Sequence, residues 1–137
     1  MVEADRTDQT EALSCFIDLD WFEESGRSFA VIARHCLCSH CEERLVSEPE
    51  TITPASLIAN VENCCSNVPG FIDSRLPLLE KMFRFLLSEG NRPLRLDEVT
   101  ARLGLYVDNP ASLTPSVLKR LLDNNQHYGF RLRPGED

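Results

Sequence analysis

The chain has 137 residues and a formal net charge of -8, with 42% hydrophobic and 26% charged residues. This composition is typical of a globular protein with one or two small domains. No apolar run approaches the roughly 20 residues that span a bilayer, and the polar, acidic start is unlike a secretory signal. We therefore expect a cytoplasmic protein that does not bind membranes. Residues 1–12 are expected to form a flexible tail, and no pattern indicates a particular oligomeric state.

Charge is distributed unevenly along the chain. Residues 1–70 contain thirteen Asp or Glu against four Arg and no Lys, whereas residues 71–137 contain nine Asp or Glu against ten Lys or Arg. Phosphates would repel the first half, so contact with nucleic acid is expected only from the second half. Most carboxylates of the acidic half are interpreted as a solvated surface.

The first elements in chain order are short helices. Residues 18–24 predict a helical turn, and residues 27–35 predict a helix with Phe29, Ile32, Ala33 and Cys36 on one face. The following segment, LCSHCEERL, is interpreted as a tight turn.

A longer helix is expected after a loop at residues 47–53. Thr53 and Pro54 have the residue types of a helix start, and the apolar pattern continues to about residue 67. Pro69-Gly70 ends it. We place a domain boundary near residue 70, so that residues 13–70 form a helical, cysteine-rich metal-binding module.

The clustering of the cysteines is the strongest chemical signal. A secreted disulfide framework is disfavoured, because no export signal is present and the cysteines are grouped. Clustered thiolates in a reducing compartment bind metals or perform redox chemistry. The six are Cys15, Cys36, Cys38, Cys41, Cys64 and Cys65.

Spacing indicates which cysteines bind the metal. Cys38 and Cys41 are separated by two residues, so two sulfurs can converge on one ion, and zinc takes four ligands in a tetrahedron. Cys64 or Cys65 supplies the third ligand, and Cys36 is the preferred fourth. The less favoured candidates for the fourth position are Cys15, His35 and His40.

Zinc is the expected metal, with a [4Fe–4S] cluster as the alternative, since both take four thiolates. Cysteine is also a common core residue, so at least one of Cys36, Cys64 and Cys65 is interpreted as packing only. Cys15 is assigned to the core or to the junction with the tail.

The second half predicts a clearer order of elements. PLLEKMFRFLLSE, residues 77–89, is an amphipathic helix that Gly90-Asn91 ends. Leu94 and Leu96 suggest a short extended segment, and Asp97 is expected to cap the helix DEVTARLG. A third helix runs from Thr114-Pro115 to about residue 125, and HYGFRL, residues 127–132, reads as a strand.

This order resembles that of the winged helix-turn-helix family. PLRLDEVTARLG is similar to its second helix, and LTPSVLKRLLDNN is similar to its third, or recognition, helix. The resemblance covers about residues 75–133 and lacks a diagnostic motif, and a nine-residue loop separates the two helices. We therefore expect a mainly α protein with a small β wing, in which residues 71–137 form a winged-helix-like domain.

The resemblance implies that the third helix enters the DNA major groove and that the wing touches the backbone. The candidate contacts on the helix are Ser116, Lys119, Arg120 and Asn124, and those of the wing are Arg131 and Arg133. These charges are as readily explained as a solvated surface.

Together these patterns predict a DNA-binding regulatory protein, related to transcription, with a structural or sensing metal site. The alternatives are an adaptor that binds a protein partner through the winged helix or the acidic half, and an iron–sulfur redox sensor. We expect no enzymatic activity, because the sequence has no glycine-rich phosphate loop, no Gly-x-Ser-x-Gly elbow and no HExxH helix.

Overall fold

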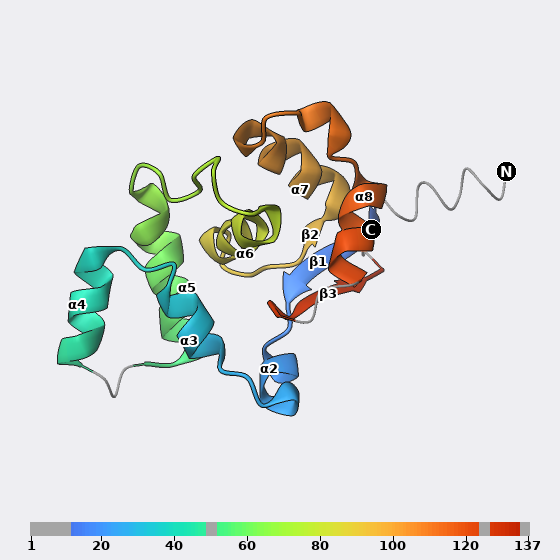
Figure 1. Ribbon diagram of the computed structural model, residues 1–137. Helices are drawn as coiled ribbons and strands as arrows, with labels where there is room; N and C mark the ends of the chain where they lie inside the picture. The colour runs from blue at the N-terminus through green and yellow to red at the C-terminus, as the bar shows by residue number, and fades with distance from the viewer. Residues whose placement is uncertain (1–11, 49–51, 124–126, 135–137) are drawn as a thin grey trace, which may run out of the picture. The chain divides into compact units, whose positions relative to one another are not determined.

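The computed structural model describes residues 12–48, 52–123 and 127–134 (Figure 1). It is mainly helical with a small three-stranded antiparallel sheet, which confirms the expected fold class. The expected tail lies, except for its last residue, outside the described residues. Within the described part, no helix has the length and apolar character that crossing a membrane requires.

The chain divides into two compact units. The helical unit comprises residues 18–91, and the mixed unit combines the residues up to Ile17 with those from Arg92 onward. This division differs from the expected boundary near residue 70. The helix that follows residue 70 packs on the helix before it, and the strand at Ser14–Ile17 pairs with strands from the second half.

The helical unit consists of short helices whose starts follow from their capping residues. The Ser28 hydroxyl accepts a hydrogen bond from the Val31 N–H, and Thr53 and Ser56 form a reciprocal capping box. The elements are α2 (Leu19–Ser25), α3 (Phe29–Arg34), α4 (Ser39–Ser47), α5 (Pro54–Asn63), the 3-10 helix η2 (Cys65–Asn67) and α6 (Leu78–Ser88).

The core of the helical unit lies where α5 packs against α3 and α6. Leu57 and Val61 of α5 and Phe83 of α6 are fully buried, and the Phe29 and Phe83 rings lie 6.1 Å apart between centroids. Helix α6 ends at Ser88, and the expected stop signal Gly90-Asn91 follows directly after its C-cap Glu89. Gly90 has φ +74, and the Asn91 N–H donates to the Leu86 carbonyl at 2.8 Å.

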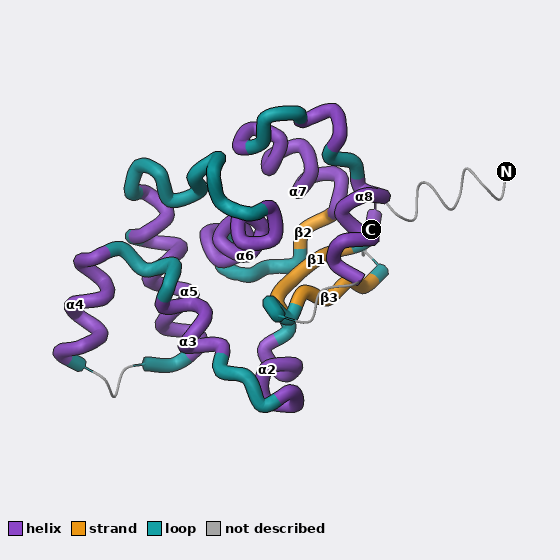
Figure 2. The backbone as a smooth tube through the Cα atoms, viewed as in Figure 1, coloured by secondary structure: helices purple, strands orange, loops and turns teal. Residues whose placement is uncertain are grey.

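The mixed unit is built on a sheet of order β2-β1-β3 (Figure 2). Its central strand comes from the N-terminal part of the chain and pairs antiparallel with both neighbours. Leu96, Val99, Leu103 and Leu118 are fully buried in this unit. Its elements are β1 (Ser14–Ile17), β2 (Leu94–Arg95), α7 (Leu96–Leu103), the 3-10 helices η3 (Gly104–Tyr106) and η4 (Pro110–Ser112), α8 (Pro115–Asp123) and β3 (Phe130–Arg133).

Three local expectations were wrong. The segment around Cys38 and Cys41 forms the helix α4 rather than a tight turn alone. Strand β1 was not expected, because its four residues are too few to show a clear alternating pattern. Helix α7 begins at Leu96 with Arg95 as its N-cap, two residues before the expected cap Asp97, so Asp97 lies in the first turn and accepts from the Glu98 N–H.

Candidate metal centre

The start of α4 brings two cysteines of the helical unit together. Cys38 is the N-cap residue in an extended conformation, and Cys41 lies in the first turn and is buried. Residues three apart at a helix start lie on the same side of the chain. Their two sulfurs therefore face one region, and the helix N-terminus there favours the thiolate form.

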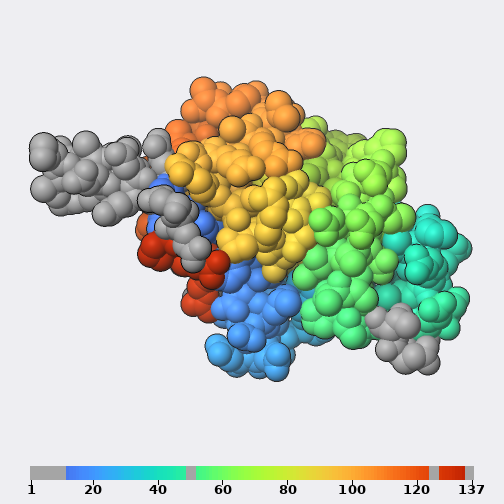
Figure 3. Space-filling view, turned by 180° about the vertical axis from the view of Figure 1, so that it is seen from behind, coloured from blue at the N-terminus to red at the C-terminus, as the bar shows by residue number. Residues whose placement is uncertain are grey.

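The other two cysteines stand where α5 ends. Cys64 has left the helical conformation, with φ -132 and ψ -64, and Cys65 begins η2. Adjacent residues of a continuous helix point about 100° apart. The break at Cys64 changes this relation, so that both neighbouring sulfurs approach Cys38. Figure 3 shows α5 in green next to α4 in cyan.

Short sulfur–sulfur distances link Cys38 to both cysteines at the end of α5. Cys38 Sγ is 3.8 Å from Cys64 Sγ and 3.6 Å from Cys65 Sγ. The Sγ atoms of Cys38, Cys41 and Cys64 all lie within 4.8 Å of one another. In addition, the Cys38 backbone N–H donates to Cys65 Sγ at 3.2 Å. The group is therefore able to hold a metal ion.

Differences in local environment give the Cys38 thiol a lower pKa than the thiols of Cys41 and Cys65. The pKa of the Cys38 thiol is lowered to about 7, chiefly by a hydrogen bond from the Cys41 backbone and, against some desolvation, by hydrogen bonds with the sulfurs of the other three cysteines. Burial raises the pKa of Cys41 and of Cys65. Cys38 therefore forms a thiolate at a lower pH than Cys41 and Cys65, and a bound cation would favour the deprotonated form of each ligand.

Cys36, the preferred fourth ligand from the sequence, does not belong to the three-sulfur group. Its side chain is buried where α3 has ended, and burial raises its pKa to about 12. Cys65 is not part of the three-sulfur group either, but its Sγ lies 3.6 Å from Cys38 Sγ, so both members of the Cys64-Cys65 pair approach Cys38. Cys15 is buried on β1, in the mixed unit, which agrees with a core role. The exposed His35 and His40 are not part of the group either.

A cavity of about 180 Å³ adjoins the cysteine group, lined among others by Cys36, Cys38, Cys65 and Arg84. Arg84 is held by the Phe71 and His35 carbonyls at 3.0 and 3.2 Å and by Glu80 at 3.2 Å. Arg84 is not among the site residues expected from the sequence. Glu80 is one turn away on the same helix, whereas the two carbonyls belong to distant segments whose approach no local pattern encodes.

The expected nucleic-acid contacts lie in the mixed unit. Ser116 and Arg120 of α8 are exposed, and Lys119 is half-buried and pairs with Asp123 at 2.7 Å. Arg131 and Arg133 are exposed on β3, whereas Asn124 lies outside the described residues. Strand β3 pairs with β1 from the other end of the chain, so the described residues after α8 contain no hairpin wing.

No protein-family model matches the chain, and no curated protein or solved structure is significantly similar to it. Fold and site together define a mainly helical protein with a cysteine group that could hold a metal ion.

Proposed function

We propose that this chain is a zinc protein in which Cys38, Cys41, Cys64 and Cys65 hold one ion in a closed, structural site. The sulfur separations carry the proposal. Four sulfurs placed 2.3 Å from the centre of a tetrahedron lie about 3.8 Å from one another. The separations from Cys38 Sγ to Cys64 Sγ and to Cys65 Sγ, 3.8 and 3.6 Å, agree with this value. Cys65 lies outside the group of three sulfurs that are within 4.8 Å of one another, so as the fourth ligand it would have to approach the other two sulfurs on metal binding.

Zinc is favoured over the alternative [4Fe–4S] cluster by the same distances. In a cluster each thiolate binds a different iron, which holds the sulfurs farther apart than the ligands of a single ion. Four protein ligands also leave no open position for a substrate, so the ion would be structural rather than catalytic. It would cross-link the start of α4 to the end of α5.

Metal analysis of matched variants tests the proposal. Protein purified without oxygen should contain one zinc per chain and be colourless. Cys41→Ser and Cys64→Ser should each lose most of the zinc, whereas Cys36→Ser, a buried thiol two residues from the site, should retain it. Iron with acid-labile sulfide would favour the cluster instead. Equal zinc loss in Cys36→Ser and Cys41→Ser would contradict the ligand set.

A second function, DNA-linked regulation by the mixed unit, is supported by its charge. Residues 92–134 contain seven Lys or Arg and four Asp or Glu. On α8, Leu118 and Leu122 are buried while Ser116 and Arg120 are exposed, so the polar side of this helix is available to a partner. Docking of α8 in the major groove is the mode that the winged-helix resemblance implies.

Duplex binding at low salt tests this second function. Lys119→Glu with Arg120→Glu should weaken binding to a mixed-sequence duplex at least about tenfold. Arg44→Glu with Arg75→Glu, in the helical unit, is the matched control. A pulldown that retains a defined protein after nuclease treatment, with no duplex binding at 50 mM salt, would favour the adaptor alternative.

A further inference from the structure

The register of the small sheet places two arginines on either side of Ser14. Ser14 pairs with Arg95 of β2 and with Arg133 of β3. Residues directly opposite each other on neighbouring strands project from the same face of a sheet. The side chains of Arg95 and Arg133 therefore project from the same face of the sheet as Ser14, one from each neighbouring strand.

The same face continues along β1 to an aromatic residue. Phe16 pairs with Arg131, and the guanidinium of Arg133 lies over the Phe16 ring, 5.0 Å from its centroid. The opposite face carries Cys15 and Ile17, which are buried. One face of this sheet thus belongs to the core, and the other presents three arginines around a half-buried phenyl ring.

A concave site lies at one end of this face. It has a volume of about 360 Å³, and its lining includes Ser14, Arg92, Arg95, Glu98 and Arg133. Ligand pockets typically have volumes of about 300–1,000 Å³. The carboxylates of Asp97 and Glu98 partly offset the positive charge of the arginines at this site. Asp97 pairs with Arg95 at 2.9 Å, and Glu98 pairs with Arg102 at 3.4 Å. Both pairs are half-exposed and are therefore weak enough to exchange for a phosphate.

We propose that this face, formed by Ser14, Phe16, Arg95, Arg131 and Arg133, binds single-stranded nucleic acid. A backbone phosphate occupies the concave site between Arg95 and Arg133, and an adjacent base stacks on the Phe16–Arg133 pair. Arginine forks match phosphate oxygens in pairs. Planar aromatic and guanidinium groups accept any base without sequence preference, which is the usual chemistry of single-strand binding.

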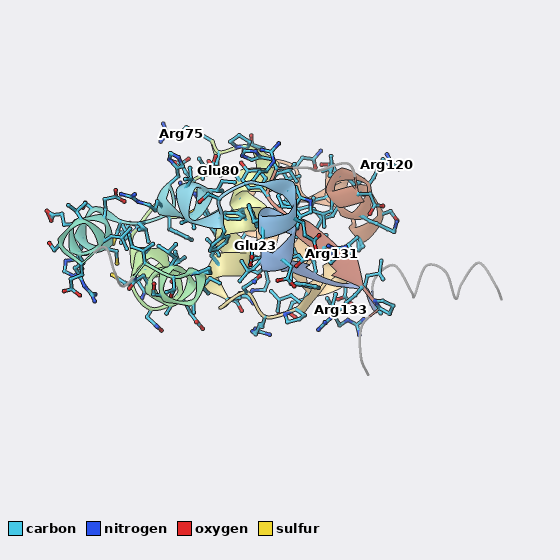
Figure 4. All side chains as sticks on the ribbon, turned by 90° about the horizontal axis from the view of Figure 1, so that it is seen from below. Glu23, Arg75, Glu80, Arg120, Arg131 and Arg133 are labelled. Atoms are coloured by element: carbon cyan, nitrogen blue, oxygen red, sulfur yellow. The ribbon has the colours of Figure 1, made fainter. Side chains whose placement is uncertain are left out.

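This inference deepens the proposed nucleic-acid function by assigning it a second surface and a different form of the ligand. Figure 4 shows Arg120 on α8 well separated from Arg133 on β3. A duplex docked on α8 and a single strand on the sheet face would therefore depend on different arginines. Variants of each surface can be tested separately.

The test is fluorescence anisotropy of the full chain with a labelled 20-residue oligo-dT and with a mixed-sequence duplex. Oligo-dT should bind at 50 mM salt, with a log–log salt slope of about -2 if three phosphates are neutralised. Arg131→Glu with Arg133→Glu should weaken oligo-dT binding at least about tenfold. Phe16→Leu should weaken it about fivefold, while Phe16→Tyr retains binding. Unchanged circular dichroism and thermal unfolding show that each variant is folded.

The outcomes separate this inference from the function on which it rests. Loss of oligo-dT binding in Arg131→Glu/Arg133→Glu, but not in Lys119→Glu/Arg120→Glu, supports the sheet face. Duplex binding that depends on Lys119 and Arg120, without oligo-dT binding, overturns the inference and keeps the DNA proposal. Binding of neither probe contradicts both. Equal affinity for free dTMP and oligo-dT also overturns the inference, because it would identify a nucleotide pocket instead of a strand site.

Discussion

The Sγ atoms of Cys38 and Cys64 lie 3.8 Å apart, although 26 residues separate them in the chain. A disulfide would bring two sulfurs to about 2.05 Å, so these two are free thiols held at the separation of ligands to one ion. The start of α4 supplies one and the end of α5 supplies the other. Removing the metal should therefore loosen this junction.

Chelation should lower the stability of the helical unit. A ligand present at a hundred times its dissociation constant stabilises the folded state by about 2.7 kcal/mol. For a unit of this size, that corresponds to a fall in Tm of roughly 10 °C or more. Differential scanning calorimetry with and without a zinc chelator measures this change in Tm. Cys36→Ser is the control, and its Tm should fall on chelation as that of the wild type does. An unchanged Tm in zinc-loaded protein after complete chelation would contradict a structural ion.

Alkylation of metal-free protein should begin at Cys38. Its pKa is lowered to about 7, so its reactive thiolate forms as the pH rises through 7, about two units below an ordinary cysteine. Burial raises the pKa of Cys15 and of Cys36 to about 12, and these thiols should stay unreactive. Iodoacetamide labelling between pH 5 and pH 9, followed by peptide mass spectrometry, measures how far each cysteine is alkylated at each pH. Zinc should suppress labelling of Cys38. Labelling of Cys36 at a lower pH than Cys38 would contradict the prediction that Cys38 is the most reactive thiol.

Truncating a side chain at the centre of the helical core should lower the free energy of unfolding far more than truncating a side chain on its surface. Leu57 of α5 has no exposed area, so Leu57→Ala should lower the free energy of unfolding by about 2–5 kcal/mol. Val46 of α4 is 67% exposed, and Val46→Ala should change it by less than about 0.5 kcal/mol. Urea denaturation monitored by Trp21 fluorescence measures both. Similar losses in the two variants would show that α5 is not central to the core.

Disrupting β1 should unfold the mixed unit and leave the metal centre in place. Ile17 is 1% exposed on the core face of the sheet, so Ile17→Asp buries an unpaired charge at a cost of at least about 3 kcal/mol. Amide exchange at Phe130–Arg133 should accelerate, whereas the zinc content stays at one per chain. Ile17→Val, which keeps the apolar contact, should leave exchange nearly unchanged. Zinc loss in Ile17→Asp would show that the two units do not fold independently.

Local chemistry determined most of the helices. Apolar residues at helical spacing, the capping residues Ser28 and Thr53 and the stop at Gly90 are short-range signals, and helices appear where these signals predict them. The spacing of Cys38 and Cys41 likewise required no long-range information, because two residues between thiols suffice to orient both toward one point.

Tertiary structure alone decided how distant segments combine. Cys65 approaches Cys38 where Cys36 was expected to do so, because the chain leaves the helical conformation at Cys64 and no periodic pattern encodes that break. Strand β1 lies between β2 and β3, although nearly eighty residues separate it from β2. Strand pairing depends on hydrogen bonds between distant backbones, which four residues of sequence do not specify. The sequence by itself therefore determined the helices and the cysteines of the candidate site, and the packing of distant segments decided which thiols approach Cys38 and which residues form the arginine-bearing face.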